Sequence, residues 1–261
     1  MTQTSIRISG LRKSFGKGNN QKEVLKGIDL EIESGKIIGY IGPNGAGKST
    51  TVKILCGILT SFTGDIEVMG IPLRGNDLSV KSKIGYVPEN GALYEALTPN
   101  EYLNLVGTLF NMSQDLITER STSLLKYFEM DKHADQRMDT FSKGMKQKIL
   151  IIAGLINNPD ILFLDEPLSG LDANSVILVK DMLTRLAQQG KTIFYSSHLM
   201  DVVEKISDRI ILIDDGKVIA DGTFEELQKD SKVSLEQLFA RLTNGDNKVS
   251  ETSVLDDVFK N

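Results

Sequence analysis

The chain contains Gly42-Pro43-Asn44-Gly45-Ala46-Gly47-Lys48-Ser49, an octapeptide that fits the pattern G-x-x-x-x-G-K-[ST]. Glycines allow backbone N–H groups to face phosphate oxygens without an intervening Cβ atom. Residues 36–41 predict a buried strand before the loop, and residues 48–57 predict a helix after it, whose N-terminus attracts anions. The pattern therefore predicts a phosphate-binding loop, in which Lys48 reaches the β and γ phosphates and Ser49 binds Mg²⁺. A glycine-rich turn with a surface lysine is the alternative interpretation.

Strand and helix patterns alternate along most of the chain, which favours an α/β fold with a largely parallel sheet. The N-terminal third differs, because it contains short strand patterns, at residues 6–11, 24–33 and 66–68, that predict a small antiparallel piece. Residues 88–158 contain helical patterns with no strand between them, at residues 99–112, 115–130 and 144–156. Strand patterns return after this insertion, at residues 161–165, 192–195, 209–213 and 217–220. We therefore predict a phosphate-loop core with an N-terminal antiparallel β subdomain and an inserted helical subdomain.

Length and composition exclude several classes of protein. A chain of 261 residues, with 40% hydrophobic and 25% charged residues, is a folded globular protein rather than a disordered one. The net charge of −5 argues against nucleic acid as a partner, since its phosphates require a basic face. The single cysteine, Cys56, fits a reducing compartment and is expected to be a small core residue. The sequence has no apolar stretch of 18 residues, so we expect a cytoplasmic protein without a membrane span.

Two carboxylates, Asp165 and Glu166, follow the apolar residues 161–164. The carboxyl end of a buried strand is where α/β sheets place their ligands. Asp165 is therefore predicted to hold Mg²⁺, and Glu166 to polarise a water molecule aimed at the γ-phosphate of ATP. On its own, such a run more often marks a strand that meets solvent, so this interpretation depends on the phosphate loop.

Residues 141–147 read Phe-Ser-Lys-Gly-Met-Lys-Gln and begin a predicted helix just before the acidic strand. The order of phosphate loop, helical insertion, this segment, acidic strand, residues 169–172 and His198 resembles the nucleotide-binding subunit of an ATP-binding cassette (ABC) transporter. The resemblance covers about residues 5–229 and implies a P-loop NTPase core. The family signature is Leu-Ser-Gly-Gly-Gln, of which this chain keeps Ser142 and Gly144. The resemblance implies a head-to-tail dimer, in which these two residues complete the ATP site of the opposite subunit.

Three further residues match positions at which the family contacts nucleotide or the dimer interface. Phe15 matches an aromatic that stacks on adenine, and the alternative is a strand-edge phenylalanine in the core. His198 matches a histidine that contacts the γ-phosphate and takes part in catalysis. Asp172 matches an aspartate that crosses the dimer interface, and it could also be a helix N-cap. Thr50, directly after the octapeptide, is included among the residues expected to bind nucleotide.

Glu89 is a departure from the family, which usually has glutamine at the entry to the helical insertion. A carboxylate at this position could still bind Mg²⁺ and contact the transport partner, but it adds negative charge near the γ-phosphate. Together with the Ser-Lys-Gly-Met form of the signature, it resembles bacterial export subunits for drugs, antibiotics and sodium.

The resemblance implies an ATPase that powers a membrane exporter through ATP-driven closure of a dimer. Its expected partners are separate transmembrane permease subunits and a second ATP-binding subunit, identical or different, so the chain would lie on the inner face of the cell membrane. Alternatives are an importer subunit, a soluble ABC ATPase acting on ribosomes or DNA, and a small-molecule kinase. Residues 230–261 are expected to form a short amphipathic helix, with Leu235, Leu238, Phe239 and Leu242 on one side, and a tail.

Overall fold

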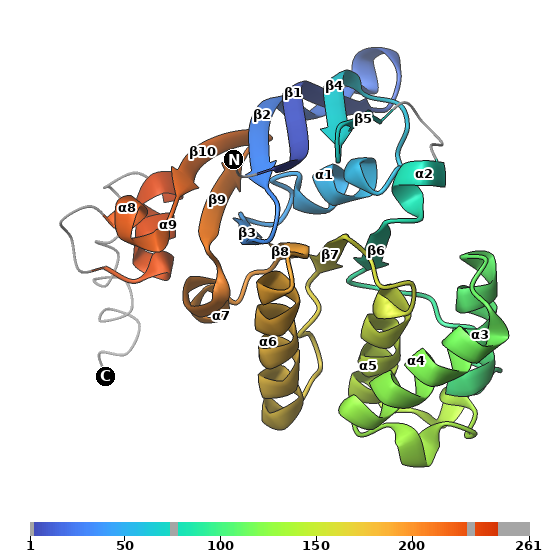
Figure 1. Ribbon diagram of the computed structural model, residues 1–261. Coiled ribbons are helices and arrows are strands. Elements are labelled where there is room, and N and C mark those ends of the chain that lie inside the picture. Colours follow the sequence, from blue (N-terminus) through green and yellow to red (C-terminus); the bar gives the residue numbers. More distant parts are fainter. Residues whose placement is uncertain (1–2, 74–77, 229–232, 245–261) are drawn as a thin grey trace, which may run out of the picture.

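Figure 1 shows the computed structural model of the chain, which describes residues 3–73, 78–228 and 233–244. The N-terminal part forms an antiparallel sheet of strand order β2-β1-β4-β5, comprising β1 (Thr4–Phe15), β2 (Lys22–Glu33), β4 (Thr63–Val68) and β5 (Ile71–Pro72). The strands β1 and β2 extend further than predicted, because residues 13–15 at the end of β1 pair with β2 alone. A short 3₁₀ turn, Gly18–Asn20, joins the two strands.

The second sheet has the strand order β10-β9-β3-β8-β7-β6 and is parallel except for the hairpin of β9 and β10. Its strands are β3 (Ile37–Ile41), β6 (Ile84–Val87), β7 (Ile161–Asp165), β8 (Thr192–Ser196), β9 (Arg209–Asp214) and β10 (Lys217–Gly222). Every residue of β3, β7 and β8 is buried, as expected for central strands covered on both faces. In β3, Ile38 and Tyr40 face the antiparallel sheet, whereas Ile37 and Ile41 face the core shared with the helices.

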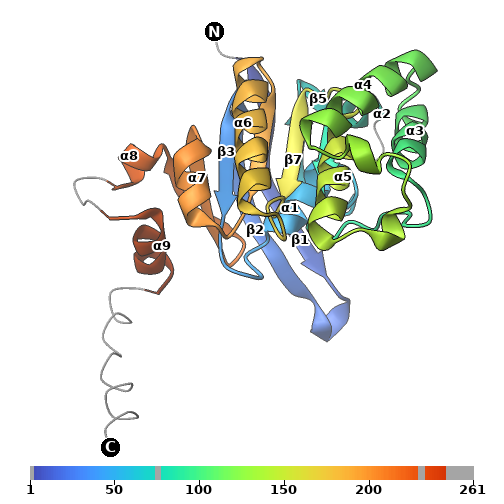
Figure 2. The same cartoon turned by 90° about the horizontal axis from the view of Figure 1, so that it is seen from below.

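The helices are α1 (Lys48–Leu55), α2 (Leu78–Lys81), α3 (Pro99–Leu109), α4 (Gln114–Tyr127), α5 (Lys143–Leu155), α6 (Ala173–Gln188), α7 (Met200–Ile206), α8 (Phe224–Gln228) and α9 (Leu235–Asn244). Two 3₁₀ turns, Asp131–His133 and Met138–Thr140, lie between α4 and α5. In Figure 2, α3, α4 and α5 lie together at one side of the molecule and α8 and α9 at the other. The α/β fold, with an antiparallel β piece and a helical cluster beside a P-loop NTPase core, is confirmed.

Several helix boundaries differ from the prediction. The helix predicted over 99–112 ends at Leu109, because Asn111 adopts a left-handed backbone with φ +56°. Likewise α4 ends before Glu129, at φ +58°, although apolar periodicity continues to residue 130. Periodicity reports which face is buried and not where the backbone reverses, so these ends were predicted too late. Strand β6 and helix α7 were not predicted from the sequence, because they are too short to show a clear period. The predicted tail beyond residue 244 lies outside the described residues.

The parallel sheet places the ends of its strands where a ligand can be bound. The loop after β3, the acidic residues at the end of β7 and the histidine after β8 all lie at the carboxyl edge of adjacent strands. Helix α5 packs directly on β6, since a Cβ atom on Gly85 would lie 2.1 Å from the carbonyl oxygen of Gly154. Among the described residues, no helix has the length and apolar character needed to cross a bilayer.

Candidate nucleotide site

The loop between β3 and α1 has a shape that only glycine allows at two of its positions. Gly42 packs so closely that a Cβ atom would lie 2.1 Å from the carbonyl oxygen of Ile213. Gly47, the N-cap of α1, has φ +110°, and its Cβ atom would lie 2.5 Å from Leu25 Cδ2. Gly45, at φ +84°, faces open space instead, since a Cβ atom there would meet no atom of the described residues within 4 Å. The loop therefore presents bare backbone toward the cavity, which suits phosphate oxygens.

Lys48 begins α1 and folds back over this loop. Its Nζ atom donates hydrogen bonds to the carbonyl oxygens of Gly42, at 2.7 Å, and Pro43, at 3.2 Å. Burial lowers the pKa of Lys48, and the negative charges of Glu166, Asp165 and Glu89 oppose that shift. The ammonium group is thus held beside the glycine loop by two carbonyl oxygens. Phosphate oxygens are anionic and would form stronger hydrogen bonds with it.

The residues predicted to hold Mg²⁺ fit that ion. Asp165 is 3% exposed, yet its Oδ1 atom accepts no hydrogen bond within the described part of the chain. An unsatisfied buried carboxylate oxygen is unfavourable unless a cation or water occupies the adjoining space. Ser49 and Glu89 line the same cavity, so the three residues together offer the hydroxyl and carboxylate oxygens that Mg²⁺ prefers.

Glu166 lies directly after β7 in a left-handed backbone conformation, with φ +50°. Such a conformation is uncommon for residues other than glycine, and it clusters at functional sites. Its carboxylate is 12% exposed, and His198 Nδ1 lies 2.8 Å from its Oε2 atom. The Ser197 hydroxyl lies 3.2 Å from the same oxygen. The carboxylate predicted to be the base is therefore oriented by two consecutive residues that follow β8.

One cavity of about 610 Å³ brings most of the predicted site residues together. It is lined by the predicted residues Asn44, Gly45, Gly47, Lys48, Ser49, Thr50, Glu89, Asp165, Glu166 and His198. Gly42, Pro43 and Ala46 shape the loop without lining the cavity, and Ala46 is buried. Lys22 and Val24 also line it, and neither was predicted from the sequence. They arrive through the hairpin of β1 and β2, for which no local motif gives a signal.

Phe15 stands at the rim rather than in the cavity. It is 41% exposed, and the register of the hairpin places it opposite Lys22. The Lys13 ammonium group lies 4.8 Å from the centre of the Phe15 ring, so one face of the ring is already covered by a cation. The ring is exposed rather than part of a core, which leaves a free face for a flat base.

Ser142, Gly144 and Asp172 do not line the cavity. Ser142 caps α5 by accepting a hydrogen bond from the backbone N–H of Met145, and Asp172 caps α6 by accepting one from Ser175. Gly144 packs so closely on Gly170 that a Cβ atom would lie 2.8 Å from its carbonyl oxygen. The signature segment thus contacts residues 169–172 of its own chain and lies away from the phosphate loop.

Two side chains strengthen this contact between the signature segment and the loop after Glu166. Gln147 is buried and donates from Nε2 to the carbonyl oxygen of Pro167, at 3.1 Å. The Lys143 ammonium group donates to the Ser169 hydroxyl, at 3.1 Å. The first turn of α5 is therefore attached to the segment that follows the predicted base.

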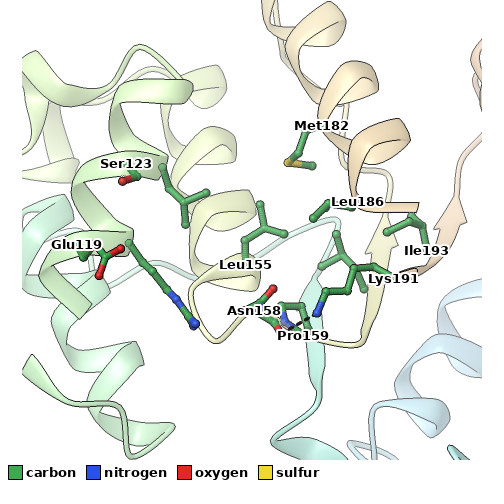
Figure 3. A pocket seen from close by; sticks show the side chains of 12 residues that line it. Glu119, Ser123, Leu155, Asn158, Pro159, Met182, Leu186, Lys191 and Ile193 are labelled. Carbon is green, nitrogen blue, oxygen red and sulfur yellow. Dashed lines mark hydrogen bonds between the residues drawn. The ribbon is translucent and has the colours of Figure 1, made fainter. Parts of the chain in front are cut away.

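A second cavity of about 370 Å³ lies between α4, α5, α6 and β8, among the side chains shown in Figure 3. Met182 and Leu186 of α6 form part of its apolar wall, and Lys191 bonds to the carbonyl oxygen of Asn158 beside it. None of the predicted site residues lines this cavity. The nucleotide site is therefore assigned to the cavity at the phosphate loop.

Comparison with known proteins agrees with this geometry. The family model described as ABC transporter matches residues 25–169. The linearmycin resistance ATP-binding protein of Bacillus subtilis is 36% identical over 222 residues, which cover 85% of this chain and 70% of that protein. The Nod factor export ATP-binding protein I of Rhizobium sp. strain N33 is 35% identical, over 85% of this chain and 72% of its own length.

Solved structures agree as well. One ATP-binding subunit of an ABC transporter has a TM-score of 0.83 and 29% identity, over 91% of this chain and 99% of its own. A dimeric ATP-binding cassette, in a post-hydrolysis state with bound ADP and Pi, has a TM-score of 0.77 and 27% identity, over 84% of this chain and 98% of its own. Fold and phosphate loop together define a P-loop NTPase. The chain belongs to the ABC transporter family, in which it is an ATP-binding subunit and an ATPase.

Proposed function

We propose that this subunit powers a membrane exporter, by hydrolysing ATP between two subunits that close on the nucleotide. The observation that carries the proposal is the shared cavity, in which a bare glycine loop and Lys48 face Asp165 and Glu166. Phosphoryl transfer to water requires a phosphate-binding surface beside carboxylates that hold the metal ion and activate the water. A kinase would also need a site for its acceptor substrate, and no acceptor-substrate motif is visible in the sequence.

Each group that lines the cavity has a separate role in ATP hydrolysis. The loop backbone and Lys48 bind the β and γ phosphates. Lys48 then donates to phosphate oxygens in place of the carbonyl oxygens of Gly42 and Pro43. Ser49, Asp165 and Glu89 would hold Mg²⁺, which when bound neutralises charge on the phosphate oxygens. Glu166 accepts a proton from the attacking water, whose oxygen forms a bond to the γ-phosphorus. The bond from that phosphorus to the bridging oxygen breaks, and its electron pair leaves with ADP.

His198 is assigned to the γ-phosphate. Its side chain is 67% exposed and borders the nucleotide cavity, so it can turn toward a bound phosphate. It would then leave Glu166 Oε2, which lies 2.8 Å from its Nδ1 atom. Ser142, Gly144 and Asp172 are assigned to the second nucleotide site of a head-to-tail dimer. None of the three lines the nucleotide cavity of its own chain, which supports their assignment to the site of a partner.

Attachment to a permease is assigned to an apolar groove of about 370 Å³ between α1, β6, α3 and α5. The residues lining it include Ile58, Tyr86, Tyr102, Val106 and Phe110. Ile58 is 53% exposed, and an exposed apolar groove of this kind favours contact with another protein. Glu89 follows β6 closely and lines the nucleotide cavity, so one segment borders both the groove and the nucleotide.

The names of the Nod factor export and linearmycin resistance relatives support export as the direction of transport, and import remains the second candidate.

The decisive experiment replaces the proposed base, as Glu166→Gln. This variant should bind ATP normally, release Pi at less than about 1% of the normal rate and accumulate as an ATP-bound dimer on gel filtration. Glu119→Gln, which changes a carboxylate outside the nucleotide cavity, is the matched control and should behave as wild type. Normal Pi release by Glu166→Gln would remove Glu166 from the role of base.

Co-purification of a membrane permease, followed by substrate uptake into inside-out vesicles, would separate export from import.

A further inference from the structure

Ser197 touches two parts of the nucleotide site at once. It is 1% exposed, and its Oγ atom lies 3.1 Å from the backbone N of Leu199 and 3.2 Å from Glu166 Oε2. A backbone amide can only donate, so Oγ accepts from Leu199. An ionised carboxylate can only accept, so the hydroxyl proton points to Glu166. In this geometry the hydroxyl oxygen accepts from Leu199 and the hydroxyl proton is donated to Glu166.

The two oxygens of the Glu166 carboxylate are held differently. Oε2 accepts the hydrogen bond from Ser197 and lies 2.8 Å from His198 Nδ1. No described residue donates a hydrogen bond to Oε1. The carboxylate is thus held by one edge, and Oε1 is the oxygen that remains available to a water molecule.

The backbone of Glu166 is held from the same place. Its N–H donates to the carbonyl oxygen of Ser196, at 2.9 Å, and this bond extends the pairing of β7 with β8 by one residue beyond Asp165. Ser196 fixes the backbone of the base, and the next residue in the chain fixes its side chain. Leu199, the other partner of Ser197, is the N-cap of α7. Ser197 therefore connects the base to the segment that carries His198.

We infer that Ser197 is a positioning residue for ATP hydrolysis: its hydroxyl holds Oε2 so that Oε1 of Glu166 receives the proton of the attacking water. The inference rests on the proposed function, in which Glu166 is the base and His198 turns to the γ-phosphate. His198 is largely exposed and leaves Oε2 when it turns, whereas Ser197 is buried and stays. The buried hydroxyl then keeps the carboxylate aligned during the chemical step.

Removing the hydroxyl should affect the chemical step and not the binding of nucleotide. Ser197 does not line the cavity, so Ser197→Ala should leave KM for ATP within about twofold of wild type. The value of kcat should fall about 10- to 100-fold, which is the effect expected for loss of a hydrogen bond to a charged group at the reacting centre. Ser197→Thr keeps a hydroxyl at this position and should recover most of the lost kcat.

The experiment compares Pi release, affinity for a fluorescent ATP analogue and thermal unfolding of each variant. Ser121→Ala is the matched control, because Ser121 of α4 is also a buried serine and its hydroxyl has no hydrogen-bond partner among the described residues. That variant should keep wild-type kcat, which separates the loss of a particular hydrogen bond from the loss of any buried hydroxyl. Equal analogue affinity in all variants shows that the site remains folded.

The extra methyl group of Ser197→Thr can prevent rescue for steric reasons alone, because Ser197 is buried. A double variant therefore provides an independent test of the inference. In the Glu166→Gln background, Ser197→Ala should cause less than about a twofold further change in single-turnover hydrolysis, since the group it orients is no longer a base. Wild-type kcat in Ser197→Ala, or a full further loss in the double variant, would overturn the inference and leave the proposed function standing. Wild-type turnover in Glu166→Gln alone would instead overturn the proposed function, and the inference with it.

Discussion

Replacing Gly47 by alanine tests whether the shape of the phosphate loop is set by backbone geometry and packing together. An L-residue in a left-handed conformation is destabilised by about 1–2 kcal/mol relative to glycine. At Gly47 the added Cβ atom would also lie 2.5 Å from Leu25 Cδ2, and overpacking of this kind costs about 1–3 kcal/mol. We therefore expect Gly47→Ala to lower the free energy of unfolding by about 2–5 kcal/mol.

Two other glycines separate these contributions. Gly190 at φ +86° and Gly45 at φ +84° share the left-handed backbone, and a Cβ atom on either would meet no atom of the described chain within 4 Å. Gly190→Ala and Gly45→Ala should each cost only the backbone strain, about 1–2 kcal/mol. Gly45 lines the nucleotide cavity, so Gly45→Ala should in addition weaken ATP binding, whereas Gly190→Ala should not.

Urea denaturation followed by circular dichroism measures the stabilities, and a fluorescent ATP analogue measures the affinities. Under this reasoning Gly47→Ala is the least stable of the three variants, and Gly45→Ala has lost affinity while matching Gly190→Ala in stability. Equal stability of Gly47→Ala and Gly190→Ala would show that the contact with Leu25 relaxes without loss of free energy. That result would refute the argument that packing against β2 determines the loop.

Three further predictions concern single side chains. Lys48→Ala should weaken binding of the ATP analogue about 10- to 100-fold, and unchanged affinity would contradict the assignment of the phosphate loop. Thr98→Ala removes the capping box that Thr98 forms with Glu101 at the start of α3, so urea denaturation should show a loss of about 1–2 kcal/mol. Hydrogen bonds from Ser175 hold the pKa of Asp172 below its ordinary value of 3.8. Because that pKa is lowered on folding, Asp172 stabilises the fold above its unfolded pKa, and this contribution is lost as the pH falls through the folded value. The stability advantage over Asp172→Asn, which retains an N-cap, should therefore be constant near neutral pH and shrink below about pH 4, and an advantage independent of pH would contradict the argument.

Local chemistry explains which parts of the site could be predicted from the sequence. Phosphate binding needs closely spaced glycines and a lysine, so the loop around Lys48 is recognisable as a continuous stretch. Asp165 and Glu166 are recognisable because a buried parallel strand is a continuous apolar run that ends at the ligand edge. These features need no knowledge of long-range pairing, and the parallel sheet follows from the alternation of strands and helices.

The parts that could not be predicted depend on register between distant segments. Ser197 reaches Glu166 because β8 pairs with β7, with Ser196 opposite Asp165. Lys22 reaches the cavity because the hairpin of β1 and β2 folds over it. Neither residue lies in a motif, so only the pairing of strands reveals its position. Likewise, the ends of α3 and α4 are set by single left-handed residues that apolar periodicity does not register.

The contact between α5 and the loop after Glu166 has a mechanical consequence. Gln147 and Lys143 bond to that loop, and Gly144 lies directly on Gly170, so the start of α5 and the loop form one unit. In the proposed head-to-tail dimer, Glu166 at one end of this unit would act on the ATP bound to its own chain. Ser142 and Gly144 at the other end would contact the ATP bound to the partner subunit. The two ATP sites would then share a common moving part, and opening one would strain the other. We therefore expect the two ATP sites to bind ATP and release its products in a coupled rather than an independent manner.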